Sequence, residues 1–100
     1  MEREPNTNLN GQPWTEEEIL ANWNKGTVIP NYDPKKFRLD ICGQEMLWNQ
    51  YANRNSDYGW EIDHINPVAN GGIDIDSNLQ PLNWKTNQAK SEQLNWHCGQ

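Results

Sequence analysis

Residues 60–64, Trp-Glu-Ile-Asp-His, alternate between two kinds of side chain, and this alternation constrains the fold more than any other stretch of the chain. Successive side chains of a β-strand point to opposite faces. The pattern therefore predicts a strand with Glu61 and Asp63 on one face and His64 at the end of the other. Because Glu61 alternates away from His64, it is expected to be exposed.

The residues that follow predict a loop, a second strand and a helix. Residues 66–77 are polar and contain a Gly-Gly turn, and residues 78–82, Asn-Leu-Gln-Pro-Leu, form a short extended piece. Residues 83–93 are typical of a helix for which Asn83 is the N-cap. Trp60 and Trp84 are expected to pack the first strand on this helix.

The sequence of residues 1–56 predicts a flexible segment followed by a short helical region. Residues 1–13 are polar and rich in asparagine, which indicates a flexible segment. Residues 14–56 are expected to be a helical lead-in packed on the core. Its first helix begins with a capping box of Thr15 and Glu18, and a second is expected over residues 45–52. With residues 57–95 as the strand-loop-strand-helix motif, the chain is predicted to be one α+β domain with additional short N-terminal helices.

The amino-acid composition indicates what kind of core the chain can form and where in the cell it is expected. Only 34% of the residues are hydrophobic, although six tryptophans supply large apolar side chains. No apolar run is long enough to span a membrane, and the polar start does not resemble a secretory signal. We therefore expect a cytoplasmic protein without a membrane partner. Cys42 and Cys98 belong to no paired motif; they are expected to be reduced thiols, with a disulfide as the open alternative.

The net charge of −6 argues against a protein that coats nucleic acid through phosphate contacts alone. The cations are grouped rather than evenly spread. One cluster lies in residues 35–38, Arg54 stands alone, and Lys85 and Lys90 share the predicted C-terminal helix. A polyanionic partner would have to be bound locally or through a metal ion.

The end of the predicted strand carries side chains suited to phosphodiester hydrolysis. Asp63 supplies an anionic oxygen that suits Mg²⁺ or Mn²⁺. His64 has a side chain that can be neutral near pH 7, as a general base requires. On the helix, Asn87 could add an amide oxygen to the same metal, and Lys90, one turn later, could contact a phosphate.

Each of these features also has a simpler interpretation. An Asp-His pair on a strand is common, and such a histidine often makes only a structural hydrogen bond. Asp74 and Asp76 are typical of loop solvation and turn formation. His97 and Cys98 could suggest a zinc site with Cys42, but they lie in a tail that is expected to fray.

These residues together resemble the HNH endonuclease motif, which has a ββα-metal (His-Me finger) fold. The motif consists of an acid and a histidine at the end of the first strand, a proline, a Gly-Gly turn, an Asn-Leu-x-x-Leu strand, and a helix with Asn and Lys three residues apart. Here these are Asp63, His64, Pro67, Gly71, Gly72, Asn78, Leu79, Leu82, Asn87 and Lys90. Residues 33–46 and 51–60 also resemble the lead-in of a subgroup of small HNH proteins.

The resemblance implies a role for each matching residue. Asp63 and Asn87 would hold one divalent metal, most readily Mg²⁺ or Mn²⁺, with Ni²⁺ or Zn²⁺ as further options. His64 would be the general base, Asn78 would brace the loop that holds His64, and Lys90 would contact a phosphate. The chain lacks the paired cysteines that hold a structural zinc in many HNH proteins, so no structural zinc is expected.

The resemblance leaves two kinds of function open. The first is a metal-dependent endonuclease that hydrolyses DNA, with Arg54 and Lys85 as candidate nucleic-acid contacts. The second is a binding module, or a subunit that needs a DNA-binding protein partner, which the acidic net charge favours. Loss of cleavage in a folded His64→Ala variant would separate the endonuclease from the binding module, and a faster, more specific cut after addition of the partner would indicate the subunit.

Overall fold

A computed structural model describes residues 3–99 of the chain, in which two α-helices and five short strands form an α+β fold. In chain order the helices and strands are α1 (Glu16–Trp23), β1 (Thr27–Val28), β2 (Phe37–Leu39), β3 (Glu45–Leu47), β4 (Trp60–His64), β5 (Leu79–Asn83) and α2 (Trp84–Lys90). Strands β1, β2 and β3 form one antiparallel sheet in that order, and β4 and β5 form a second, two-stranded sheet. The fold class predicted from the sequence is therefore correct at the α+β level.

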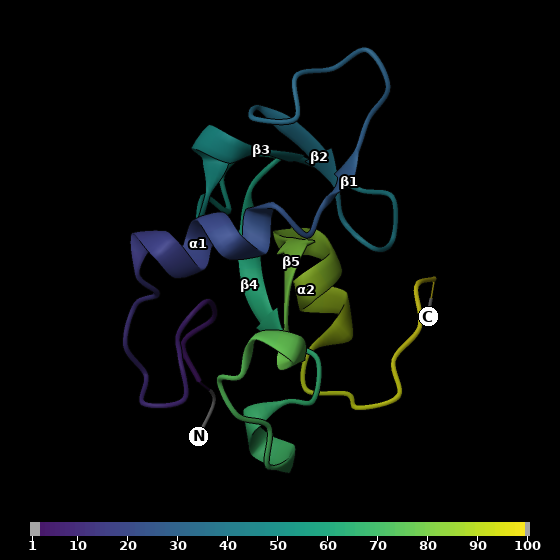
Figure 1. Cartoon of the computed structure of the whole chain (residues 1–100). Helices are drawn as coiled ribbons and strands as arrows, with labels where there is room; N and C mark the ends of the chain where they lie inside the picture. The colour runs from purple at the N-terminus through teal and green to yellow at the C-terminus, as the bar shows by residue number, and fades with distance from the viewer. Residues whose placement is uncertain (1–2, 100) are drawn as a thin grey trace.

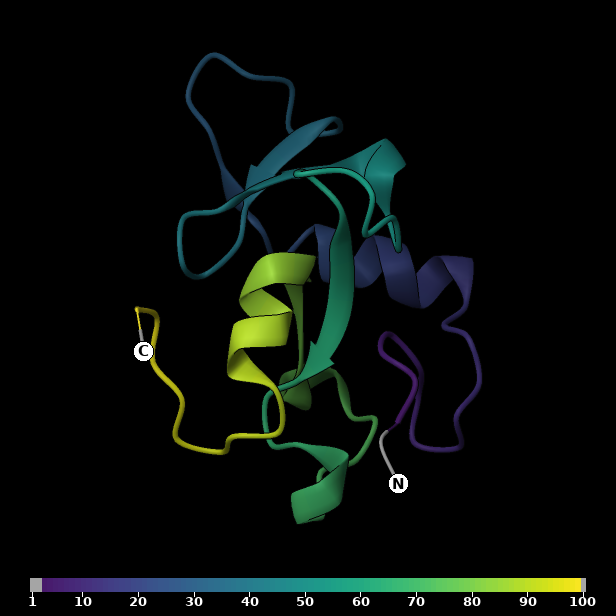
Figure 2. The same cartoon turned by 180° about the vertical axis from the view of Figure 1, so that it is seen from behind.

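The β4–β5 sheet lies between the two helices. In Figure 1 helix α1 crosses in front of β4 and β5 while α2 lies behind them, and Figure 2 shows the reverse from the other side. Every residue of both strands is buried. The loop between the strands projects from the end of β4, at the side of the molecule away from the three-stranded sheet (Figure 1).

Strand β5 contains Pro81, and the register of the sheet explains why this proline is tolerated. Ile62 lies opposite Pro81, and the backbone N–H of Ile62 points away from β5 to the side chain of Asn6. The two residues therefore form a pair without hydrogen bonds between them, where proline loses no ladder bond. Both strands predicted from the sequence, β4 and β5, are confirmed.

The core is built from aromatic rings on the α1 side of β4. Trp60 is fully buried, and its ring lies 5.1 Å from that of Trp23 and 4.9 Å from that of Tyr51. Trp60 thus packs toward α1 rather than α2, which corrects the expected packing on the C-terminal helix. Trp84 is only partly buried, and its indole N–H donates to the carbonyl of Ser56.

Both α-helices begin as the sequence predicts. The capping box of α1 is present, because Thr15 accepts from the N–H of Glu18 while the Glu18 side chain accepts from the N–H of Thr15. Asn83 caps α2 by accepting from the N–H of Lys85, and its amide nitrogen donates to two carbonyls upstream. Helix α2 ends at Lys90, three residues before the predicted end.

The helix predicted over residues 45–52 is wrong. Residues Glu45–Leu47 form β3, paired with β2, and Trp48–Gln50 form a single 3₁₀ turn. The predicted helical spacing rested on few positions, and pairing with β2 outweighs the local preference. In place of two α-helices, the lead-in holds one α-helix and a three-stranded sheet.

The N-terminal segment makes specific contacts, in contrast to the flexible segment that the sequence predicts over residues 1–13. Asn6 accepts from the N–H of Ile62 on the outer edge of β4, and the N–H of Leu9 donates to Asp74. Thr7 and Pro13 form an isolated β-bridge. The N-terminal segment is therefore attached to the outer edge of β4 at Ile62 and to the loop at Asp74. Residues 1–2 lie outside the described part of the chain.

The expectation of reduced thiols is wrong, because Cys42 and Cys98 form a disulfide with their Cα atoms 5.4 Å apart. The bond joins the turn between β2 and β3 to the C-terminal tail. It removes both thiolates that a zinc site with His97 would need. The cytoplasmic location stays a prediction.

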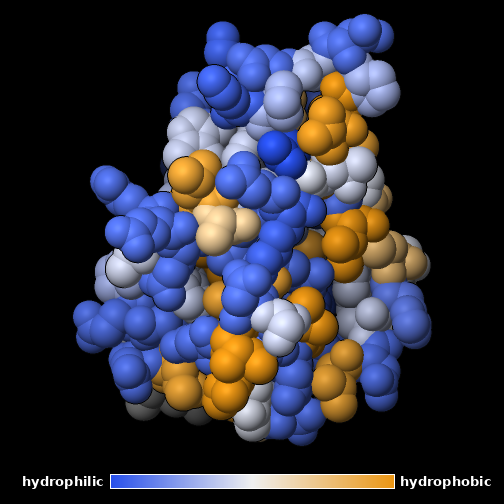
Figure 3. Space-filling model, in the orientation of Figure 1, coloured by the Kyte–Doolittle hydropathy of each residue, from blue (hydrophilic) through white to orange (hydrophobic). Residues whose placement is uncertain are grey.

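The surface is mixed in character. On the face shown in Figure 3, apolar side chains form several small groups separated by hydrophilic ones. None of the helices within residues 3–99 has the length and apolar character that crossing a membrane requires.

The disulfide is expected to stabilise the fold, because it closes a stretch of 56 residues in the unfolded chain. Reduction should lower the free energy of unfolding by roughly 2–4 kcal/mol. Urea titrations with and without dithiothreitol measure this change as a lower midpoint. A Cys42→Ser, Cys98→Ser double variant should show the lower midpoint in both conditions; equal midpoints for oxidised and reduced wild type would contradict the prediction.

Candidate active site

The two faces of β4 carry different chemistry and meet different parts of the fold. On one face, Glu61 accepts from the amide of Asn87 and Asp63 pairs with Lys90, so this face is covered by α2. His64 extends from the other face, where its ring lies 5.6 Å from that of Trp14. The opposed directions of Asp63 and His64 follow from the strand alternation read in the sequence.

The end of β4 opens into a cavity of about 390 Å³. Asp63, His64 and Asn87 all line it, and so does Arg54. Its remaining wall includes residues 3–7 of the N-terminal segment. The fold therefore brings the predicted general base and the two predicted metal ligands to one hollow, although they come from β4 and α2.

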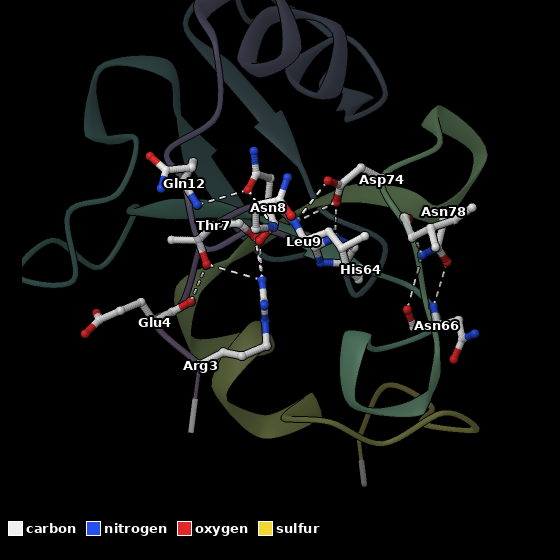
Figure 4. A network of polar contacts seen from close by, with 12 residues as sticks. Arg3, Glu4, Thr7, Asn8, Leu9, Gln12, His64, Asn66, Asp74 and Asn78 are labelled. Atoms are coloured by element: carbon white, nitrogen blue, oxygen red, sulfur yellow. Dashed lines mark hydrogen bonds and ion pairs between the residues drawn. The ribbon is translucent and has the colours of Figure 1, made fainter. Parts of the chain in front are cut away.

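His64 is held on one side by a carboxylate. Its Nε2 lies 2.7 Å from Oδ1 of Asp74, and the residue is 8% exposed. Asp74 in turn accepts from the backbone N–H of Leu9 (Figure 4). The sequence predicted loop solvation and turn formation for Asp74, with a metal role as the lesser alternative, so this contact with His64 was missed. Asp76 in the same loop does form an exposed ion pair, with Lys25.

Asn78 ties together the two ends of the loop after β4. Its Oδ1 accepts from the N–H of Asn66, 2.8 Å away, and its Nδ2 donates to the carbonyls of Ile73 and Asn66 (Figure 4). Within the loop, Gly71 has φ +89°, and a Cβ on Gly72 would lie 1.7 Å from the carbonyl oxygen of Asn66. These contacts are of the kind the resemblance implied for Asn78, and its part in catalysis stays a prediction.

Asp63 lies in a buried network of polar groups. The residue is 7% exposed, accepts a hydrogen bond from Gln80, and has Nζ of Lys90 3.3 Å from each carboxylate oxygen. Burial raises the pKa of the Asp63 carboxyl, while Gln80, Lys90 and His64 act in the opposite direction. The site therefore disfavours the charged form of Asp63 through desolvation that its present partners do not fully offset.

Lys90 was predicted to contact a phosphate. In the structure it is 3% exposed, and its ammonium group donates to Asp63 and to the backbone carbonyl of His64. The ammonium thus lies beneath the strand end and joins the two site residues. Contact with a phosphate stays a prediction.

Glu61 is buried, which corrects the expectation that it is exposed. It is 2% exposed, and its carboxylate accepts two hydrogen bonds from Arg54, at 2.7 and 2.8 Å, and one from Asn87. Because a carboxylate only accepts, the Nδ2 atom of Asn87 must face Glu61. The amide oxygen of Asn87 is then the atom left to bind a cation.

Arg54 and Lys85, the two predicted nucleic-acid contacts, both lie over Trp84. Each cation is 5.8 Å from the centre of a Trp84 ring. Their ionic partners differ, since Arg54 pairs with buried Glu61 and Lys85 with exposed Asp57. Their contact with nucleic acid stays a prediction.

No group of three or more His, Cys, Asp or Glu side chains in residues 3–99 is placed to hold a metal ion. The candidate ligands are instead one carboxylate, Asp63, and one amide, Asn87. Such a pair leaves most coordination positions of a divalent ion to water and substrate oxygens, as is usual for Mg²⁺.

A two-stranded antiparallel sheet, a tight loop at the end of its first strand and a helix packed on its face carry Asp63, His64, Asp74, Asn78, Asn87 and Lys90. Comparison with protein-family models identifies this part of the chain: the HNH endonuclease model matches residues 40–93. The match covers more than half of the chain, which therefore belongs to the HNH endonuclease family. Comparisons with curated proteins and with solved structures gave no match.

The burial of Glu61 leads to a test of stability. Arg54→Ala leaves a buried carboxylate without its cation, and we expect it to lower the free energy of unfolding by roughly 1–3 kcal/mol, discounted because Arg54 is itself partly exposed. Lys85→Ala is the matched control, because it removes a cation over the same indole but leaves only an exposed carboxylate. Urea denaturation measures the free energy of unfolding of both variants. Equal losses would contradict the expectation that leaving the buried Glu61 carboxylate unpaired costs more than leaving an exposed carboxylate unpaired.

Proposed function

We propose that the protein is a metal-dependent endonuclease that hydrolyses DNA phosphodiester bonds and leaves 5′-phosphate and 3′-hydroxyl ends. The observation that carries this proposal is the shared cavity at the end of β4, which Asp63, His64 and Asn87 all line. Membership of the HNH endonuclease family favours a nucleic-acid substrate.

The residues of the cavity fit a divalent metal ion by the chemistry of their donor atoms. Asp63 offers a carboxylate and Asn87 an amide oxygen, and both are hard donors that suit Mg²⁺ or Mn²⁺. The desolvated carboxylate of Asp63 would gain from a cation, since burial already raises its pKa. When bound, such an ion would offset negative charge on the scissile phosphate and the departing oxygen.

The other steps fall to the chain's own side chains. His64 takes the proton from the water that attacks phosphorus, which requires its imidazole to be neutral. Asn87 keeps its amide oxygen toward the cavity because its nitrogen donates to Glu61. Asn78 holds the loop that follows His64.

A second candidate is favoured by the net charge of −6. The same site would then act as a partner-dependent nuclease, or as a binding module, whose affinity for DNA comes from a basic protein partner. In that case the isolated domain cuts slowly or not at all.

Plasmid nicking tests the proposal with purified protein and Mg²⁺, Mn²⁺, Ni²⁺, Zn²⁺ or EDTA. We expect cutting with at least one of the first two metals, none in EDTA, and none from a folded His64→Ala variant. His97→Ala is the matched control, because it removes the only other histidine in the chain and should keep the activity. Cutting by His64→Ala at the wild-type rate would contradict the proposal. If the folded wild type fails to cut in the presence of any of the four metals, the second candidate is favoured.

Metal binding can be measured without cleavage. We expect Asn87→Ala to weaken Mn²⁺ binding about tenfold or more in isothermal titration, because loss of an outer partner of a ligand alone costs that much. Asn55→Ala, which removes an exposed amide outside the cavity, should bind Mn²⁺ like the wild type. Equal affinities for all three proteins would exclude Asn87 as a ligand.

A further inference from the structure

Asp74 is the residue whose placement no feature of the motif explains. It lies in the loop between β4 and β5, and one of its carboxylate oxygens is 2.7 Å from Nε2 of His64. Both carboxylate oxygens also accept from the N–H of Leu9, at 3.0 and 2.9 Å. Figure 4 shows Asp74 with contacts both to Leu9 of the N-terminal segment and to the imidazole of His64.

Asp74 lies behind His64 as seen from the cavity. His64 lines the cavity at the end of β4, whereas Asp74 is not among the described residues that do so. Asp74 is therefore not placed to contact a substrate bound in that cavity. Asp74 reaches that cavity only indirectly, through the imidazole of His64 and through Leu9 of the N-terminal segment, whose residues 3–7 form part of the cavity wall.

The loop is built so that Asp74 keeps this position. The amide of Asn78 donates to the carbonyl of Ile73, the residue directly before Asp74, at 2.9 Å. The turn at Gly71 and Gly72 is closed too tightly for a side chain at Gly72. On the other side, the indole of Trp14 lies against the imidazole at a tilt of 42°. The imidazole is thus held from two sides, and Asn78 fixes both chain neighbours of Asp74, because its N–H also donates to the carbonyl of Ile75.

We propose that Asp74 is a positioning residue for His64, and this inference rests on the proposed nuclease function for its catalytic consequence. A carboxylate only accepts hydrogen bonds, so Nε2 of His64 carries the hydrogen atom and donates this hydrogen bond to Asp74. The lone pair of the neutral imidazole is then on Nδ1, the nitrogen that takes the proton of the attacking water. The carboxylate also stabilises the imidazolium that this proton transfer forms.

Nuclear magnetic resonance of ¹⁵N-histidine protein tests the hydrogen bond without any cleavage. We expect a slowly exchanging, downfield proton coupled to Nε2 of His64, assigned with a His97→Gln variant. The signal should be present in Asp76→Asn, a matched control in which a carboxylate of the same loop is lost. It should be absent in Asp74→Ala and moved upfield or lost in Asp74→Asn, which keeps the shape of the side chain.

Steady-state cleavage by the same proteins tests the catalytic consequence. Both Asp74 variants should lower kcat about 10- to 100-fold, as does loss of the partner that orients a metal-bound histidine. KM for DNA should not change, because Asp74 does not line the cavity. Circular dichroism confirms folding, and the isosteric Asp74→Asn variant decides the matter if Asp74→Ala does not fold.

The two proposals fail in distinguishable ways. Absence of metal-dependent cutting by the wild type overturns the nuclease function, whereas the Nε2 proton signal still decides whether Asp74 holds His64. Retention of that signal in Asp74→Ala overturns the inference. So does a kcat of either Asp74 variant equal to that of Asp76→Asn.

Discussion

Strand β4 is buried on both faces, yet its second and fourth residues are carboxylates, and the arrangement around it follows from the need to compensate these charges. A buried charge without a partner costs several kcal/mol. Glu61 is compensated by Arg54 and Asn87, and Asp63 by Lys90 and Gln80. Two of these partners belong to α2, one turn apart on the same face of the helix. The helix can therefore dock on β4 in only one register, and this register brings Asn87 to the cavity.

The opposite face of β4 shows how the loop and the N-terminal segment depend on the same strand. His64 leaves the core face at the strand end, beside Trp14, and its second contact comes from Asp74 in the loop. The loop is closed by Asn78, and the N-terminal segment reaches it through Leu9. Parts of the chain that are distant in sequence thus converge on one imidazole. The site is formed by the whole fold rather than by the motif alone.

The parts of the fold that the sequence predicted are those specified by short-range pattern. The alternation of side chains identified β4. The capping box, formed by Thr15 and by Glu18 three residues later, identified the start of α1. The helix expected over residues 45–52 failed because strand pairing with β2 decides the conformation there, and pairing is invisible in a short window. The burial of Glu61 was missed for a related reason, since alternation gives two faces but does not say that α2 covers the second.

The long-range contacts of the site could not have been read from the sequence. Asp74 is ten residues from His64, and nothing in its own neighbourhood distinguishes it from Asp76. The Cys42–Cys98 bond spans 56 residues and belongs to no motif. In each case the decisive fact is which distant segments meet, and this depends on the docking of the loop and of the C-terminal tail.

The distribution of cations limits how this site can meet a polyanion. Among the lysines and arginines of residues 3–99, Lys35 and Lys36 alone have side chains without an ion pair or hydrogen bond within the chain. Both precede β2, outside the cavity. Phosphate contacts through lysine and arginine therefore contribute little affinity unless internal pairs are broken. Under the proposed function, further positive charge would come from a cation at Asp63, where Lys90 is the present partner, or from a basic partner protein. The acidic composition and the nuclease-type site are thus compatible if a bound ion or a partner adds to the positive charge of the chain's own lysines and arginines.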